Sequence, residues 1–316
     1  MKQFTTADPG AHQQWVTHPR GERPEILHHW MSSDQTEPII RFRGAAICSS
    51  ESSPLLHHRI FLEFAEGGSL WSLMEARRAL KRPIPEDFVW IVLMNLVEAC
   101  IRMEEVGVVH LDINPHNVLL STNHDRQGGH WLDVYRPVLA DFGKTHPFGE
   151  ALGPHDTGKL GFTSPEQFEA AIGISNKSND KVHVYGIGFT IWCMIRNLGS
   201  GLEQSLDSNP PRAVFISPQG TNINPAPPAF SPDPRITVRN DVDLNSSKYS
   251  EGLEYLIQQC LIYDPAQRIT LEQLGERVGT RIFERGMDQS ARPADEFALM
   301  DTFDEMFVNA DDAIEA

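Results

Sequence analysis

H-L-D-I-N-P-H-N-V-L-L, residues 110–120, and L-A-D-F-G-K, residues 139–144, are the two stretches that decide the fold and chemistry of this chain. The first places Asp112 and Asn117 just before a short apolar run, and the second places Asp141 just after another. Two acids and an amide at the ends of short strands form one oxygen-rich cluster. Such a cluster suits magnesium, which keeps several waters and takes phosphate oxygens as well. The sequence therefore predicts a site for magnesium and a phosphate-bearing ligand.

The composition is that of a globular protein with a strong acidic excess. A chain of 316 residues can bury a large core and form one or two domains, and its apolar fraction of 40% is ordinary. Lys and Arg together number 27 against 43 Asp and Glu, which gives a formal net charge of −16. A general nucleic-acid binder needs a basic surface, so we expect no nucleic-acid partner. A nucleotide site in this chain has to neutralise phosphate locally.

Neither targeting nor membrane insertion is indicated by the sequence. The N-terminal stretch MKQFTTADPG has no apolar core of a signal peptide. The longest apolar stretch, Val182 to Ile195, is too short for a membrane span, and we expect a buried helix there. The four cysteines are far apart and match no metal-ligand spacing, which fits a reducing compartment. We therefore expect an intracellular protein, cytoplasmic or nuclear, with no membrane span.

Hydrophobic periodicity predicts helices separated by short strands and long inserts. Helices are expected at 22–31, at 70–80 with Ser69 as cap, at 86–105 with Gly107 at its end, and at 252–263 and 271–283. Short strands are expected at 39–42, 45–48 and 59–64. Residues 122–136, with His124, Asp125 and His130, are predicted to form an exposed hairpin tip, and 199–248 a long, partly disordered loop. The acidic tail 285–316 either docks as an amphipathic helix or frays.

Six motifs in a fixed order carry a resemblance to a known family. They are LEFAEGGSL (62–70), HLDINPHN (110–117), DFG (141–143), SPEQ (164–167), VYGIG (184–188) and DPAQRIT (264–270). With these motifs, the chain resembles a eukaryotic protein kinase of the serine/threonine type. The resemblance implies an α+β, two-lobed fold with an incomplete, β-rich N-terminal lobe at 1–65. A helical C-terminal lobe at 66–284 and the tail 285–316 would follow.

The resemblance also implies roles for individual residues. Asp112 becomes the catalytic base, Asn114 stands where a lysine normally lies near the transferred phosphate, and Asn117 and Asp141 become the metal ligands. His110 and Phe142 would belong to the packed apolar spine, and Glu166 would pair with Arg268 in the large lobe. Nucleotide contacts are implied for the gate residue Leu62, the backbone of Glu63 and Ala65, the ribose contact Ser69, the pocket floor Leu119 and the phosphate-pairing Lys2.

Several positions depart from the family pattern. No glycine-rich loop and no V-A-I-K motif are visible, so Lys2 is either the phosphate-pairing lysine or an arbitrary terminal lysine. Leu111 replaces the catalytic-loop arginine that anchors a phosphorylated activation segment. His183 replaces an expected aspartate, with Asp180 nearby, and the helix glutamate that should pair with the lysine is Glu22 or Glu25.

Two functions of different classes follow from these features. In the first, the chain uses ATP and Mg²⁺ to transfer the γ-phosphate to a hydroxyl of a protein substrate. The intact trio of Asp112, Asn117 and Asp141 favours this function, because pseudokinases often lose one of them. In the second, the chain is a catalytically impaired pseudokinase or scaffold, which the missing phosphate loop, Leu111, Asn114 and His183 favour. A third alternative is a fragment of a complete kinase.

Overall fold

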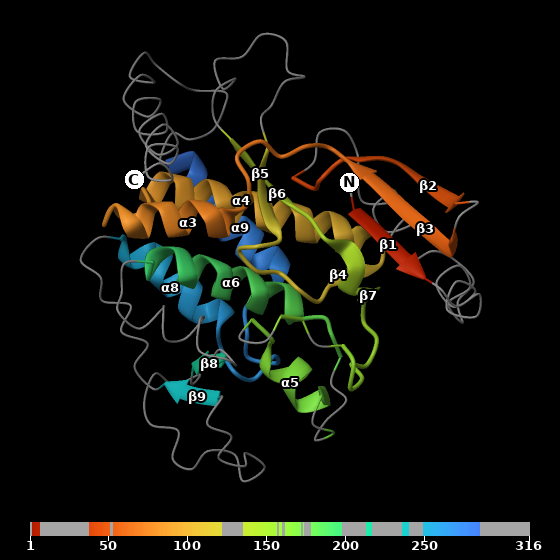
Figure 1. The fold of residues 1–316 in the computed structure, drawn as a ribbon. Helices are drawn as coiled ribbons and strands as arrows, with labels where there is room; N and C mark the ends of the chain where they lie inside the picture. Colours follow the sequence, from red (N-terminus) through yellow and green to blue (C-terminus); the bar gives the residue numbers. More distant parts are fainter. Residues whose placement is uncertain are drawn as a thin grey trace.

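The structure is a computed structural model of the chain, and it describes residues 2–6, 38–50, 53–121, 135–156, 158–159, 162–171, 173, 178–197, 213–216, 236–239 and 249–284. The helix expected at 22–31, the side chains of His124, Asp125 and His130, and the tail 285–316 lie outside these residues. Figure 1 shows a small β-sheet at one side of a larger helical body. The expected two-lobed α+β fold is confirmed.

The small lobe, as far as it is described, is one antiparallel sheet with the strand order β1-β3-β2. Its strands are β1 (Lys2–Thr6), β2 (Phe42–Ser50) and β3 (Ser53–Leu62). The register sets Lys2 opposite Ile60 and Phe42 opposite Leu62. β3 is the central strand, so it leads directly from the middle of this sheet into the segment that enters the large lobe.

The strand expected at 39–42 was wrong except for its last residue. Ile39 forms a single parallel bridge with Leu139 instead. The Ile40 amide donates to the Leu139 carbonyl at 2.9 Å, and the Leu139 amide donates to the Pro38 carbonyl at 2.8 Å. Ile39 and Ile40 are fully buried in this contact. Residues 38–40 therefore tie the small sheet to the large lobe rather than extending β2.

Two helices of the large lobe have the predicted caps, and their ends agree with the prediction to within one residue. Helix α3 (Leu70–Ala79) starts after Ser69, whose hydroxyl accepts a hydrogen bond from the Ser72 amide, as an N-cap does. Helix α4 (Glu86–Glu105) ends before Gly107, which takes a left-handed conformation with φ of 77°. Both predictions are confirmed. The sequence predicts these helix ends because capping residues and helix breakers act on residues next to them in the chain.

Short strands between α4 and the next helix carry the predicted site. Strand β4 (Val108–His110) pairs antiparallel with β7 (Thr145–Pro147), and β5 (Val118–Ser121) pairs antiparallel with β6 (Arg136–Leu139). The 3₁₀ turn η1 (Phe142–Lys144) follows β6. In Figure 1 the β5–β6 pair lies between the small sheet and the helices. The two pairs thus gather the quoted motifs at the junction of the lobes.

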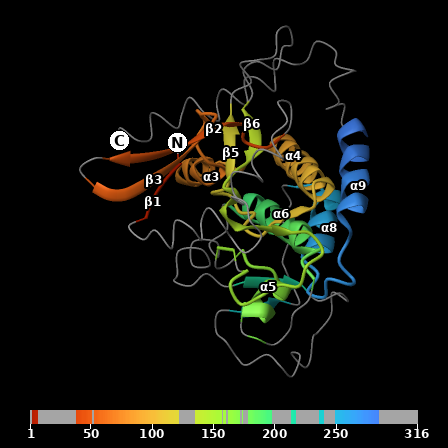
Figure 2. The same cartoon turned by 90° about the vertical axis from the view of Figure 1, so that its right-hand side faces the viewer.

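The remaining helices form the body of the large lobe. They are α5 (Pro165–Ala171), α6 (Val182–Ile195), α8 (Glu251–Cys260) and α9 (Leu271–Glu284). Every residue of α6 is buried, which confirms the expected buried helix. A Cβ at Gly188 would overlap the Cys260 side chain, so α6 and α8 approach closely only because that position is glycine. Figure 2 shows α9 at the side of the body opposite the sheet.

One insert differs from its prediction. The segment 199–248 was expected to be a loop, but it contains the strands β8 (Ala213–Ile216) and β9 (Ile236–Arg239), which pair in parallel. Such a pairing joins residues far apart in a Pro-rich stretch, and periodicity within a short window cannot predict it. Among the residues that the structure describes, no helix is long and apolar enough to cross a membrane.

Candidate active site

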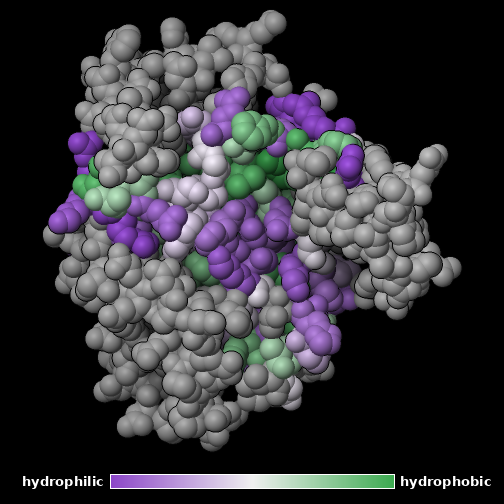
Figure 3. All heavy atoms as spheres, viewed as in Figure 1, coloured by the Kyte–Doolittle hydropathy of each residue, from purple (hydrophilic) through white to green (hydrophobic). Residues whose placement is uncertain are grey.

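The three oxygen-bearing residues of the quoted motifs are held at neighbouring strand ends. Asp112 follows β4, Asn117 precedes β5, and Asp141 follows β6. The Ala140 amide donates to the Asn117 carbonyl at 2.8 Å, which places Asp141 next to Asn117 across the β5–β6 pair. In Figure 3, drawn from the side of Figure 1, the described surface at the centre of the molecule is hydrophilic.

The Asp112 carboxylate is fixed by three N–H donors. Its Oδ1 accepts from the Asn114 side chain at 3.0 Å and from the Lys159 amide at 2.6 Å. Its Oδ2 accepts from the Asn117 side chain at 3.1 Å. An ionised carboxylate has about four acceptor positions, so these bonds orient the group and leave capacity for one more donor. A substrate hydroxyl is a donor of the right kind.

The backbone of the same loop is positioned by His110, which is fully buried. Its Nδ1 accepts a hydrogen bond from the Asp112 amide at 3.1 Å, so its Nε2 carries the proton and donates to the Ala140 carbonyl at 3.1 Å. Burial lowers the pKa of His110 to about 4, against the opposing attraction of Asp112, so the ring is neutral at pH 7. The ring packs edge-on against Phe142 with centroids 5.4 Å apart. The two residues expected to pack together therefore do so.

A buried histidine and a glutamate from α4 complete this arrangement. The His110 amide donates to His183 Nε2 at 2.7 Å, so the proton of His183 is on Nδ1. That Nδ1 donates to Glu104 Oε1 at 2.9 Å. The departure at position 183 is thereby accommodated, because the imidazole supplies the acceptor and Glu104 fixes its tautomer. Sequence reasoning missed Glu104 and pointed to Asp180, which is exposed.

The donor set fits a hard divalent cation. The Asn117 side-chain nitrogen donates to the Asp112 carbonyl at 2.8 Å and to Asp112 Oδ2 at 3.1 Å, so its carbonyl oxygen faces away from Asp112. Asp141 is exposed, has a left-handed φ of 65°, and accepts from the Gly143 amide at 3.4 Å. A non-glycine residue in that conformation costs about 1 kcal/mol, although Asp adopts it more readily than most residues. Carboxylate and amide oxygens are what Mg²⁺ prefers.

Most residues predicted to contact a nucleotide lie between Leu62 and Ser69, in a segment that crosses β5 at Leu119. The Gly67 amide donates to the Leu120 carbonyl at 2.9 Å, and Ser69 forms an antiparallel bridge with Leu119. Leu62, Ala65 and Leu119 pack on the same apolar core. The Glu63 carboxylate pairs with Arg136 at 3.3 Å and Arg41 at 3.6 Å, which anchors the segment. Lys2 lies in β1, but its side chain is outside the described part, so its role stays a prediction.

One protein-family model matches most of the chain. The model described as a protein kinase domain matches residues 25–278 of the chain. The chain belongs to the protein kinase domain family.

The chain is similar, at low identity, to curated protein kinases. Serine/threonine-protein kinase cst-1 of Caenorhabditis elegans is 25% identical over 219 residues, 69% of this chain and 36% of the relative. MAP3K epsilon protein kinase 1 of Arabidopsis thaliana is 28% identical over 197 residues, 62% of this chain and 12% of the relative. Probable serine/threonine-protein kinase iksA of Dictyostelium discoideum is 24% identical over 181 residues, 53% of this chain and 17% of the relative. The matched part thus spans about a third or less of these relatives.

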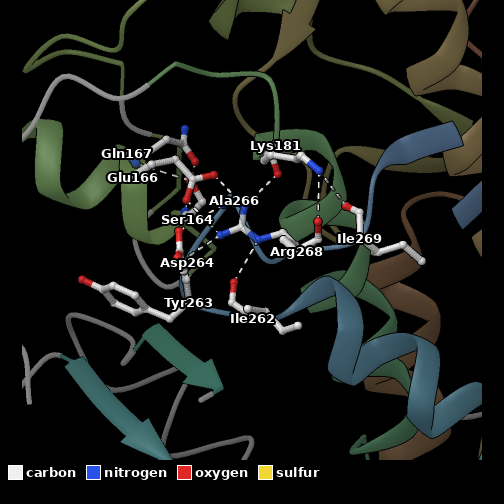
Figure 4. A network of polar contacts seen from close by, with 10 residues as sticks. All are labelled: Ser164, Glu166, Gln167, Lys181, Ile262, Tyr263, Asp264, Ala266, Arg268 and Ile269. Carbon is white, nitrogen blue, oxygen red and sulfur yellow. Dashed lines mark hydrogen bonds and ion pairs between the residues drawn. The ribbon is translucent and has the colours of Figure 1, made fainter. Parts of the chain in front are cut away.

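The large lobe of the kinase is braced by the pair of Arg268 and Glu166, both fully buried at the side chain (Figure 4). Arg268 Nη1 donates to Glu166 Oε1 at 2.6 Å, and Nη2 donates to Oε2 at 3.0 Å. The other three N–H groups donate to the carbonyls of Ile262, Lys181 and Tyr263. All five donors of the guanidinium are therefore satisfied.

Gln167 links this brace to the loop that carries Asp112, and sequence reasoning did not single it out. Its side-chain nitrogen donates to the Leu111 carbonyl at 2.9 Å and to the Asp156 carbonyl at 3.0 Å. Leu111 itself is buried in a small apolar cluster that includes Leu152 and Val182. At the position of the missing arginine, this kinase therefore has apolar packing rather than a phosphate anchor.

Proposed function

We propose that this chain is a protein serine/threonine kinase that transfers the γ-phosphate of ATP to a hydroxyl of a protein substrate, with Mg²⁺. The proposal rests on Asp112, whose carboxylate is held by three N–H donors beside Asn117 and Asp141. Membership of the kinase family supports the use of ATP and a divalent metal in general. Asn117 and Asp141 are the residues that would hold the metal, which neutralises phosphate charge when bound.

Positioning is the main task of the protein in this reaction. Phosphoryl transfer passes through a loose transition state, so the catalytic group has to orient the hydroxyl more than deprotonate it strongly. Asp112 accepts the hydroxyl hydrogen bond and takes the proton as the new phosphate ester forms. His110, His183 and Glu104 keep the loop that carries Asp112 in place. Holding the reacting oxygen close and in line lowers the barrier by removing freedom that a free hydroxyl has.

One observation favours the alternative of a scaffold without activity. The Lys159 amide already occupies Asp112 Oδ1 at 2.6 Å, and Asn114 has no charge to offer a phosphate. In that alternative Asp112 is a half-buried structural acceptor, and substrate hydroxyls do not bind to it. The two functions differ in whether the protein binds Mg-ATP and transfers its phosphate.

The test compares nucleotide binding by the unaltered protein and by Asp141→Asn. Thermal unfolding with Mg-ATP should show a ligand-dependent rise in midpoint for the unaltered protein. Asp141→Asn should lose that rise and keep the midpoint without ligand. Asp180→Asn, the same change at an exposed aspartate of the large lobe, is the matched control and should retain binding. If the unaltered protein shows no stabilisation and no transfer to a general protein acceptor, the scaffold function holds.

A further inference from the structure

Gly158 and Lys159 lie directly on the catalytic carboxylate. The Lys159 amide donates to Asp112 Oδ1 at 2.6 Å, the shortest of the three bonds to that group. A Cβ at Gly158 would overlap the Leu111 carbonyl oxygen and lie 2.9 Å from Asp112 Oδ1. Only glycine permits this approach, so the backbone of residue 159 has a defined place beside the reacting site.

The charge on Lys159 acts on the same loop. Partial burial lowers the pKa of Lys159, and the attraction of Asp112 opposes this. Among the residues that the structure describes, no carboxylate lies within ion-pair distance of its ammonium group. The Lys159 side chain is exposed, so an ammonium group beside Asp112 with no carboxylate in contact is accessible to an incoming anion.

Asn114 cannot serve a phosphate in this arrangement. Its side-chain nitrogen donates to the Asp112 carbonyl at 2.9 Å and to Asp112 Oδ1 at 3.0 Å, which uses both of its N–H groups. Its oxygen accepts from the His116 amide at 3.0 Å. The side chain is therefore committed to the loop, and positive charge for the transferred group has to come from another residue.

We propose that the Lys159 ammonium group contacts the transferred γ-phosphoryl group, as a cation supplied by the segment after DFG rather than by the catalytic loop. This inference rests on the proposed kinase function. In the step, the bond between the γ-phosphorus and the ADP oxygen breaks and a bond to the substrate hydroxyl oxygen forms. The hydroxyl proton passes to Asp112. Lys159 keeps its proton throughout and stabilises the negative charge that the phosphoryl oxygens carry.

The test is Lys159→Met, which removes the charge but keeps the backbone amide that bonds Asp112. Because that hydrogen bond is preserved, a purely structural role for residue 159 predicts no change. A role at the γ-phosphate predicts a fall in kcat of about 100- to 1000-fold, the range for loss of one preorganised electrostatic contact. The KM for the protein substrate should stay within about twofold, and Lys159→Arg should recover most of the rate.

Binding measurements separate this inference from the proposed function. By calorimetry, Lys159→Met should weaken Mg-ATP more than Mg-ADP, because only ATP has the γ-phosphate. Lys81→Met, at an exposed lysine in the turn after α3, is the control and should change neither. Unaltered protein that binds no nucleotide overturns the proposed function and the inference with it. Nucleotide binding with equal ATP affinity and equal kcat in Lys159→Met and Lys81→Met overturns the inference alone.

Discussion

The polar network around Arg268 is closed, meaning that its hydrogen-bonding groups all have partners inside the protein. The network around Asp112 is open, because part of its hydrogen-bonding capacity is left for solvent or a ligand. Arg268 and Glu166 have no exposed side-chain surface, and every N–H of the guanidinium has an acceptor. Asp112 is half-buried, and Asp141 beside it is exposed and has a left-handed backbone. Both networks consist of charged and amide groups, so composition does not distinguish them. The difference is whether all bonding capacity is used inside the protein.

A closed network contributes to the architecture, and an open one is available to a ligand. Removing one partner of a buried pair leaves an uncompensated charge, so the closed network is sensitive to single substitutions. An exposed carboxylate keeps its hydration and costs little to alter. Substitutions in the two networks should therefore separate loss of stability from loss of function.

The largest expected effect is that of Arg268→Met. It leaves the Glu166 carboxylate buried without its partner, and the free energy of unfolding should fall by about 3–5 kcal/mol. Urea unfolding followed by circular dichroism measures the change. The double variant Arg268→Met/Glu166→Met is the control and should recover a large part of the loss. A loss below about 1 kcal/mol for the single variant would show that the network is not closed in solution.

His183→Ala should have the next largest effect. The buried His110 amide loses its acceptor and a cavity forms in the core, which together cost about 2–4 kcal/mol. His183→Asp retains an acceptor at this place and should lose less. Chemical denaturation gives the free energies, and amide exchange at residue 110 reports the bond itself. Equal losses for the two variants would mean that packing, not the hydrogen bond, holds the loop.

Stability should fall as pH drops from about 6.5 to about 4, because of His110. Its pKa is lowered in the folded protein by burial, so the unfolded chain binds its proton first, below the ordinary value of 6.5. The stability that depends on the neutral His110 ring is fully present above pH 6.5. At pH 5 the free energy of unfolding should be lower by on the order of 2 kcal/mol. Urea unfolding at pH 7 and pH 5 measures the slope. His110→Phe should flatten it, and an unchanged slope would contradict the assignment.

The smallest expected effect on stability is that of Asp141→Asn. Asn tolerates the left-handed conformation, the side chain is exposed, and its bond to Gly143 is long at 3.4 Å. The free energy of unfolding should change by less than about 0.5 kcal/mol, as for other surface substitutions. Thermal and urea unfolding without ligand check this. A loss of unfolding free energy as large as that of His183→Ala would contradict this, because it would mean that Asp141 contributes to stability like the residues of the Arg268 network.

The sequence alone determined the features that depend on neighbouring residues. Ser69 as a cap, Gly107 as a helix end and the bounds of α4 and α6 follow from local preferences and periodicity. The order of the short motifs was sufficient to predict the kinase fold and to name Asp112, Asn117 and Asp141 as one cluster. Their catalytic and metal-binding roles stay proposals that the experiments above test.

Only the tertiary structure decided the contacts between distant residues. Glu104 and His183 are 79 positions apart, and Lys159 is 47 positions from Asp112, yet each pair forms a hydrogen bond. The bridge of Ile39 to β6 and the pairing of β8 with β9 are equally non-local. Local propensity acts over a few residues. The hydrogen bonds of His183 to His110 and Glu104, and the position of Lys159 beside Asp112, depend instead on how whole elements pack. Only the packing of these elements brings Lys159 next to Asp112, and the motif pattern gives no sign of that contact.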